Sequence, residues 1–93
     1  MQEDDLYLTI SKTADIVGVR SHVLRFWEKK FFLISPKKGA SGRRFYSSSD
    51  IQFLLYIKKL LYTDRFTIKG AVNFINEQDN KKLIPTENSI NNE

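Results

Sequence analysis

Hydrophobic residues recur at helical spacing in several stretches of this chain, which predicts a mainly α-helical domain. The first helix is expected over residues 11–17, after an extended stretch at residues 6–10 that alternates roughly between apolar and polar side chains. Either Thr9 or Ser11 can cap its first turn. Gly18 follows the last apolar position and suits the left-handed conformation that commonly ends a helix.

The second helix is expected over about residues 21–31. Its apolar side is marked by residues at i, i+3 and i+7, which are Leu24, Trp27 and Phe31. Its opposite side is basic and repeats the same spacing with His22, Arg25 and Lys29. Because only a tight turn at residues 18–19 separates this helix from the first, the pair has the outline of a helix-turn-helix.

The chain between residues 32 and 46 has a β-prone pattern instead of a helical one. Two short strands are predicted at residues 32–36 and 43–46, joined by a basic loop over residues 37–42 whose glycines permit a hairpin turn. A small basic hairpin beside a helix-turn-helix is typical of a wing, which contacts the flanking backbone or the minor groove of DNA. The predicted fold is therefore a mainly α winged helix-turn-helix, with four helices and a two-stranded β-hairpin wing between helices 2 and 3.

Two further helices complete the predicted domain. The third begins at an N-cap of Ser47, with Asp50 as its capping-box partner, and runs to about Tyr62. It is apolar around most of its circumference, which makes it the central core helix. The fourth is expected over residues 68–76, from a cap at Thr67, and covers one side of the third.

The length of 93 residues allows one domain. We expect a disordered lead at residues 1–7, the winged helix-turn-helix at residues 8–76, and a polar, mostly disordered tail at residues 77–93. The tail contains no repeating heptad of apolar residues, so a coiled coil is not expected there.

Positive charge is concentrated in one segment. The chain has a formal net charge of +4, but residues 20–46 hold eight basic side chains and one acidic side chain, Glu28, which is a local net charge of +7. Aromatic side chains are interleaved with these basic residues. Basic and aromatic residues in one segment indicate a polyanionic partner such as nucleic acid.

The residue types argue against several other functions. There is no cysteine, which removes disulfides and thiolate metal sites. Residues 1–5 are acidic where a signal peptide would be basic, and no apolar run reaches the length of a membrane span, so we expect a cytoplasmic protein with no membrane partner. One histidine and scattered acids assemble no catalytic or metal-ligating set, and the loop at residues 39–44 lacks the Gly-Lys-Ser/Thr ending of a phosphate loop. We therefore expect no enzyme activity, no cofactor and no metal.

Two motifs at a fixed separation are similar to those of a known family. Residues 24–28 (LRFWE) resemble the pattern L-R-[YF]-[YW]-E, and residues 42–46 (GRRFY) resemble G-x-R-x-Y. The helix start at residues 47–50 and the FTI sequence at residues 66–68 follow in the same order. Over about residues 8–75, the chain resembles the DNA-binding domain of MerR-type transcription regulators.

This resemblance implies sequence-specific binding of duplex DNA for transcription regulation, with the second helix in the major groove and the wing on the backbone. It implies that His22 and Arg25 face the bases, where an arginine is suited to guanine, and that Arg44 is the wing arginine. The lysines of the second helix and the wing would anchor phosphates. The full set of candidate DNA-binding residues is Arg20, Ser21, His22, Arg25, Phe26, Lys29, Lys37, Lys38, Arg43 and Arg44.

Some positions depart from the family pattern or have a second reading. Phe26 stands where the family often has tyrosine, so this side chain cannot donate a hydrogen bond to a phosphate. Arg20 replaces the usual Ser or Thr at the start of the second helix, and Ser21 is expected to take over as the cap. For Arg25 and Arg44, a solvated surface arginine paired with Glu28 or another acid competes with DNA contact as an explanation.

Other functions and partners stay open on the sequence alone. Family regulators continue into a dimerisation helix, so we expect a monomer at this length, a homodimer in a longer parent, and RNA polymerase at a promoter as a candidate partner. A phage-type excisionase or architectural DNA-bending protein could share the winged fold. A protein-interaction module is a further alternative, with its partner on an apolar surface of the third helix formed by Phe53, Tyr56 and Leu60.

Overall fold

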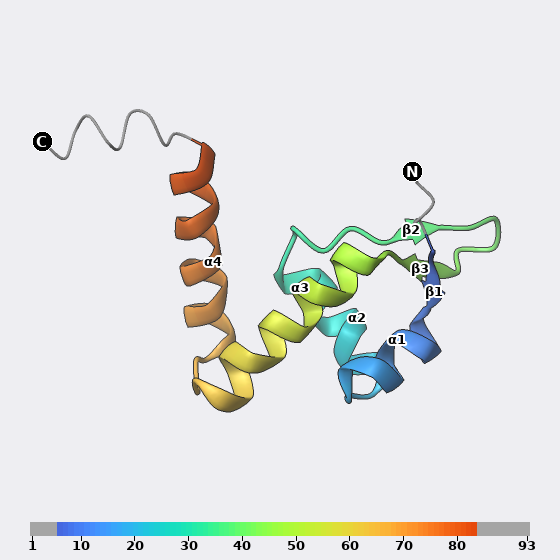
Figure 1. Ribbon diagram of the computed structural model, residues 1–93, viewed down its shortest axis with the longest axis horizontal. Coiled ribbons are helices and arrows are strands. Elements are labelled where there is room, and N and C mark those ends of the chain that lie inside the picture. The colour runs from blue at the N-terminus through green and yellow to red at the C-terminus, as the bar shows by residue number, and fades with distance from the viewer. Residues whose placement is uncertain (1–5, 84–93) are drawn as a thin grey trace, which may run out of the picture.

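The computed structural model describes residues 6–83, with side chains up to Gln78 in the last helix. The elements in chain order are β1 (Leu8–Thr9), α1 (Ile10–Val17), α2 (Ser21–Lys30), β2 (Lys37–Lys38), β3 (Arg44–Tyr46), α3 (Ser48–Lys58), a π-helical turn η1 (Lys59–Thr63) and α4 (Ile68–Leu83). The predicted mainly α winged helix-turn-helix is therefore confirmed (Figure 1). Within residues 6–83, no helix is long and apolar enough to cross a membrane.

Helix α3 is the centre of the domain. It runs through the middle of the molecule, with α1 and α2 on one side, the strands near its first turn and α4 beyond its last turn (Figure 1). The core is formed by Leu24 and Trp27 from α2, Tyr46 from β3, and Leu54 and Ile57 from α3, each at most 2% exposed. The predictions that the third helix is the core helix and that Leu24, Trp27 and Phe31 mark the apolar side of the second are confirmed.

The sheet is antiparallel, with strand order β1-β3-β2 and Lys37 opposite Phe45. The predicted strand at residues 32–36 is wrong, because those residues form a turn and an irregular segment in which Ile34 packs into the core at 5% exposure. The first strand of the hairpin is instead β2, which begins directly after the predicted strand. The loop that connects β2 to β3 is residues 39–43. The extended approach to α1 supplies β1, which makes the sheet three-stranded.

The ends of α1 are set by local polar contacts. The Thr9 hydroxyl oxygen accepts a hydrogen bond from the Lys12 backbone N–H at 3.3 Å, so Thr9 is the cap. Gly18 ends the helix with φ at +86°, a conformation that costs glycine little. Lys58 of α3 donates through Nζ to the Val17 carbonyl at 2.9 Å, which satisfies one of the carbonyls left unpaired at the helix end.

The predicted caps of the last two helices are confirmed. Ser47 Oγ accepts from the Asp50 backbone N–H at 3.1 Å, and Asp50 Oδ2 accepts from the Ser47 N–H at 3.0 Å, which completes the capping box of α3. Helical structure continues through η1 to Thr63, close to the predicted end. Thr67 Oγ1 accepts from the Gly70 N–H at 3.0 Å in the first turn of α4.

The start of α2 differs from the prediction that Ser21 is its cap. Arg20 occupies the N-cap position and makes no side-chain cap hydrogen bond, while Ser21 is already the first helical residue. A serine inside the first turn lies past the position from which a side chain can cap the helix. Arg20 instead accepts through its backbone carbonyl from the Val23 N–H at 3.0 Å.

The end of α4 also differs from the prediction. The helix continues to Leu83, beyond the expected end near Asn76. Residues 77–83 include Glu, Gln, Lys and Leu and contain neither glycine nor proline, so their intrinsic helix preference extends the apolar pattern that precedes them. The predictions of disorder for residues 1–5 and 84–93 lie outside the described residues.

Candidate nucleic-acid interface

Helix α2 turns an apolar side to the core and a basic side to solvent. Leu24 and Trp27 are buried. The basic side chains predicted to face DNA are exposed, and these are Arg20, Arg25 and Lys29 together with His22. Ser21 is half-buried at the first position of the helix. The structure therefore arranges the predicted recognition residues along one exposed strip.

The wing is a short hairpin with exposed charges. The basic side chains exposed on it are Lys37, Lys38 and Arg43. Its loop turns at Gly42, where φ is +82° and favours glycine. Lys37 Nζ lies 4.8 Å from the ring centre of Tyr7, and the Arg43 guanidinium carbon lies 5.7 Å from the ring centre of Phe45. These cation–π contacts orient the two basic side chains without neutralising them.

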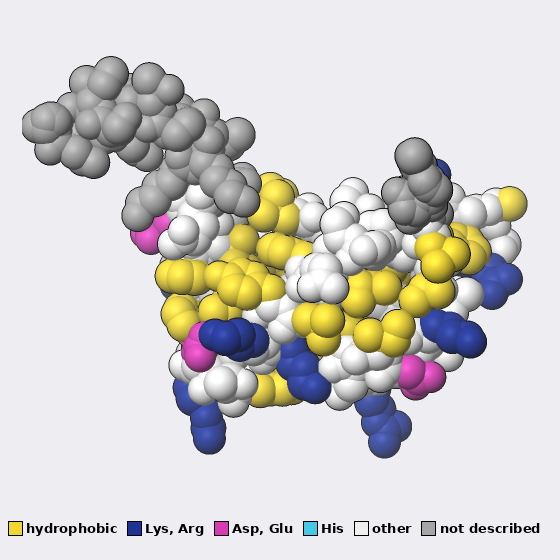
Figure 2. All heavy atoms as spheres, in the orientation of Figure 1, with side chains coloured by type: hydrophobic (Ala, Val, Ile, Leu, Met, Phe, Trp, Pro, Cys, Tyr) yellow, Lys and Arg dark blue, Asp and Glu magenta, His cyan; other side chains and the backbone are white. Residues whose placement is uncertain are grey.

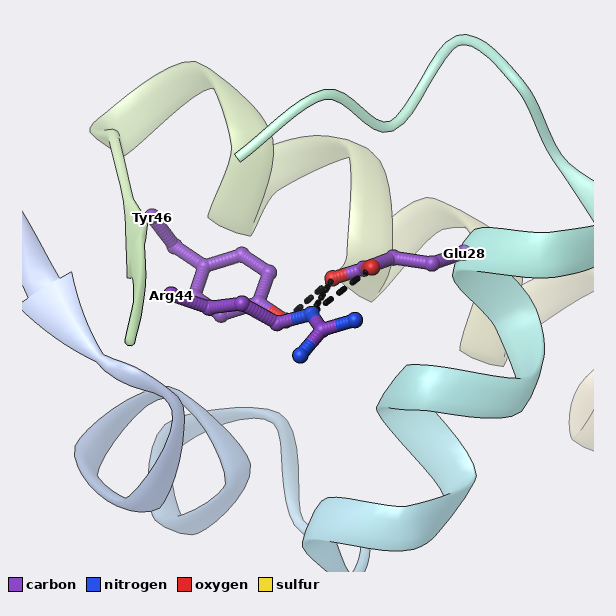
Figure 3. Close-up of polar contacts among 3 residues, drawn as sticks. All are labelled: Glu28, Arg44 and Tyr46. Carbon is purple, nitrogen blue, oxygen red and sulfur yellow. Dashed lines mark hydrogen bonds and ion pairs between the residues drawn. The ribbon is translucent and has the colours of Figure 1, made fainter. Parts of the chain in front are cut away.

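A carboxylate on α2 joins this helix to the wing (Figure 3). Arg44 Nε lies 2.9 Å from Glu28 Oε1 and 3.1 Å from Oε2, and the Tyr46 hydroxyl donates to Oε2 at 2.6 Å. The Arg44 and Glu28 side chains are 28% and 11% exposed, and Tyr46 is fully buried. We call these three side chains the α2–wing latch.

The α2–wing latch shifts the ionisation of two of its members. The hydrogen bond that Arg44 donates to Glu28 raises the pKa of Arg44, so the guanidinium stays charged. Burial raises the pKa of Tyr46, and the hydrogen bond to Glu28 raises it further, so the phenol stays protonated and remains a donor. The ion pair of Arg44 with Glu28, which was the alternative explanation for this arginine, is therefore present. It engages Nε, while DNA contact through the other guanidinium nitrogens stays a prediction.

The beginning of α1, the middle of α2 and the wing enclose a groove of about 300 Å³. The groove is lined by Thr9, Ile10, Ser11, Arg25, Gly42, Arg43 and Arg44. Three arginines from two elements therefore border one concave surface, beside the hydroxyl groups at the start of α1. Sequence reasoning missed Thr9 and Ser11 as site residues, because the only signal they gave was that of a helix cap.

A second groove of about 540 Å³ lies between α2 and the first turns of α4. It is lined by Phe26, Lys29, Lys30, Ile68, Lys69, Val72 and Asn73. Phe26 is 45% exposed, and Lys30 Nζ lies 5.5 Å from its ring centre. Lys30 belongs to the basic segment and could have been selected with Lys29. Lys69 gave no local signal, because its closeness to α2 depends on how α4 packs.

The structure brings some predicted site residues together and leaves others apart. Arg25, Arg43 and Arg44 share the first groove, whereas Lys37 and Lys38 lie on β2, an edge strand of the sheet. Figure 2 shows Lys and Arg side chains projecting along the lower edge and at the wing end, below a band of hydrophobic side chains. In the part of the chain that the structure describes, no three side chains of metal-ligating type come together.

An exposed basic helix following a tight turn, with a basic hairpin fixed beside it, defines a winged helix-turn-helix DNA-binding domain. The family model for "MerR HTH family regulatory protein" matches residues 8–78. The chain belongs to this family of transcription regulators, and its described residues form the family's DNA-binding domain.

Comparison with individual proteins agrees with this family. The chain is 47% identical over 58 residues to the uncharacterized HTH-type transcriptional regulator YyaN of Bacillus subtilis, covering 62% of this chain and 42% of YyaN. It is 31% identical over 51 residues to the HTH-type transcriptional repressor CarH of Myxococcus xanthus, covering 55% of this chain and 17% of CarH. The matched region thus spans less than half of either curated relative.

A solved structure has a similar fold. It is the crystal structure of HiNmlR, a MerR family regulator lacking the sensor domain, bound to promoter DNA. The two structures superpose with a TM-score of 0.65 at 22% sequence identity, over 94% of this chain and 73% of HiNmlR. At this identity the likeness establishes a shared fold.

Proposed function

We propose that this chain regulates transcription by placing α2 in the major groove of duplex DNA and the wing on the flanking backbone. The observation that carries the proposal is that Arg25 of α2 and Arg43 and Arg44 of the wing line one groove, on two elements joined by the α2–wing latch. A helix fits the major groove of DNA, and in this arrangement the wing would lie beside the helix, next to the phosphate backbone. Family membership favours transcription regulation over an excisionase or an architectural role.

The residues divide into those that read bases and those that hold the backbone. His22 and Arg25 are exposed on α2 and are proposed to read bases, with the Arg25 guanidinium bidentate to a guanine. The proposed backbone contacts come from the charged and hydroxyl side chains around them, namely Arg20, Ser21, Lys29, Lys37, Lys38, Arg43 and Arg44. Phe26 is proposed to make apolar contact only. Lys30 and Lys69 extend the backbone set, because they share a groove with Lys29.

The assembly and partners follow from this scheme. Duplex DNA is the proposed partner, which would place the protein in the cytoplasm, and regulation is proposed to need no catalysis. We propose that one chain binds one half-site, and that a parent carrying a dimerisation helix would bind as a homodimer and act on RNA polymerase at a promoter.

The surface proposed for a protein-interaction module is less complete than the sequence suggested. Tyr56 is 37% exposed and its ring lies 6.5 Å from that of Phe53, centre to centre. Leu60, the third residue of that surface, is 2% exposed and belongs to the core. The interaction module is therefore not favoured.

The proposal is tested by selecting a duplex target from a random library and measuring binding of Arg25→Ala to it by fluorescence anisotropy. We expect a loss of about 1–3 kcal/mol on the selected site and a relaxed preference at one base pair. Lys59→Ala is the control, because it removes one exposed positive charge from η1 and leaves α2 and the wing intact. Equal binding by Arg25→Ala and the parent would overturn the assignment of α2 as the recognition helix.

A further inference from the structure

The α2–wing latch puts an acid in the middle of a basic surface. Glu28 is the single acidic residue within residues 20–46. A carboxylate on a surface that meets phosphates weakens binding by simple electrostatics. The Glu28 side chain is 11% exposed and contacts Arg44 and Tyr46. Its contact with Arg44 offers a physical reason for an acidic residue on this basic surface.

The geometry of β3 explains how one carboxylate can hold the wing. Side chains two positions apart on a strand point to the same face, so Arg44 and Tyr46 both face α2, while Phe45 faces the opposite way. Glu28 accepts from both, and it therefore fixes the distance and rotation of β3 relative to α2 at two points (Figure 3). Ionised carboxylates make strong, directional hydrogen bonds of this kind.

The same contact determines which part of Arg44 is offered to a ligand. An arginine side chain has five N–H donors in a planar fork, and Glu28 engages the one on Nε. The N–H groups of the two terminal nitrogens remain for another acceptor. Arg44 also lines the groove of about 300 Å³ that it shares with Arg25 and Arg43.

We propose that Glu28 is a positioning residue: by holding Arg44 through Nε it aims the terminal nitrogens into this groove, where they bind one DNA phosphate together with Arg25 and Arg43. The inference rests on the proposed function, since it identifies the groove as a binding site for one backbone phosphate within the same DNA interface. Tyr46 is fully buried and acts on DNA through Glu28.

The test is Glu28→Gln, because charge repulsion alone and the positioning role predict opposite changes in DNA affinity. Removing a negative charge should strengthen DNA binding if Glu28 only repels phosphates. We expect binding to the selected duplex to weaken about tenfold instead, the equivalent of one hydrogen bond to a charged group. Asp15→Asn is the matched control, because it removes the same charge from an exposed position on α1 and should leave affinity equal or slightly higher.

A second readout separates positioning from a general loss of stability. If Arg44 no longer reaches its phosphate, the slope of log affinity against log salt should become shallower, by the amount that about one phosphate contact contributes. This change is expected although no positive charge has been removed. A domain that is merely less stable would keep the parent slope once the folded fraction is taken into account. Tyr46→Phe removes one of the two hydrogen bonds to Glu28 and should weaken DNA binding about two- to fivefold. This variant replaces Glu28→Gln in the test if Glu28→Gln does not fold.

A double-mutant cycle completes the test. In an Arg44→Ala background, Glu28→Gln should cost no further affinity, because the group it positions is gone. The proposal is overturned if Glu28→Gln binds as tightly as the parent, or if it costs the same tenfold without Arg44. Failure of the parent itself to bind duplex DNA would overturn the proposed function along with this inference. The outcomes above, in which the parent binds DNA, would overturn the inference alone.

Discussion

The contact between α2 and the wing differs in kind from the contact between α1 and α3. Helix α2 meets the wing through the α2–wing latch, a polar contact that is partly exposed. Helix α1 packs on α3 through apolar side chains, with Ala14 and Val17 in the same buried cluster as Leu54 and Ile57. On α1, Thr13 is also fully buried, and its hydroxyl has no hydrogen-bond partner among the described residues.

The difference shows which contacts give stability and which give orientation. Apolar burial is non-directional and supplies most of the free energy of folding. A partly exposed ion pair adds little to that free energy, but its hydrogen bonds have fixed directions. The apolar junction should therefore dominate the stability of the domain, and the α2–wing latch should dominate the alignment of its DNA-binding elements.

The largest expected effect comes from the apolar junction. Leu54→Ala should lower the free energy of unfolding by about 2–5 kcal/mol, since it removes a fully buried side chain and leaves a cavity. Urea unfolding followed by circular dichroism measures the change. Tyr56→Ala, at a partly exposed position of the same helix, should cost less. Equal costs at the two positions would contradict the assignment of α3 as the core helix.

A change of opposite sign is expected at Thr13. Thr13→Val keeps nearly the same shape and removes the unpartnered hydroxyl, so the free energy of unfolding should rise by about 1–2 kcal/mol. Thr63→Val, at an exposed position of η1, is the control and should change stability little. A destabilised Thr13→Val variant would mean that the hydroxyl is satisfied in solution.

The smallest expected effect is a pH dependence at the α2–wing latch. The pKa of Tyr46 in the folded protein is raised above its ordinary value of 10.0 by burial and by Glu28. The neutral phenol therefore stabilises the fold below about pH 10, and this contribution is lost as the pH rises through the folded pKa. Tyr46→Phe should be less stable than the parent at pH 8, by about 1 kcal/mol, and the difference should shrink above pH 10.

The control for this pH dependence is Tyr62→Phe, at a residue that is 54% exposed. Its difference from the parent should not change with pH in the same way. A constant difference for Tyr46→Phe from pH 8 to pH 11 would contradict the role of the phenol as a donor to Glu28.

Features governed by near neighbours in the sequence were predictable. The capping box of Ser47 and Asp50 involves residues three apart, and the glycine that ends α1 stands next to the last apolar position. The exposed basic strip of α2 follows from helical spacing alone. The exposure of the candidate site residues on this helix was therefore predictable from the sequence.

Features that depend on distant residues were not predictable in the same way. The α2–wing latch joins Glu28 to residues 16 and 18 positions away, and the sequence offered the ion pair only as one of two explanations for Arg44. Strand β2 was placed too early because it consists of two exposed lysines, which show no alternation of apolar and polar residues. The groove residues Thr9 and Lys69 join the site through packing between elements, which no local pattern records.

The most direct test of the central claim is binding of labelled random-sequence duplex DNA by the parent across a salt series, with Arg25→Ala and Arg44→Ala beside it. If α2 and the wing form one DNA-binding surface, the parent should bind with a dissociation constant of roughly 10⁻⁴ to 10⁻⁶ M that weakens steeply with salt, and both variants should bind more weakly. Binding that is absent at low salt, or that does not change with salt, would contradict the account.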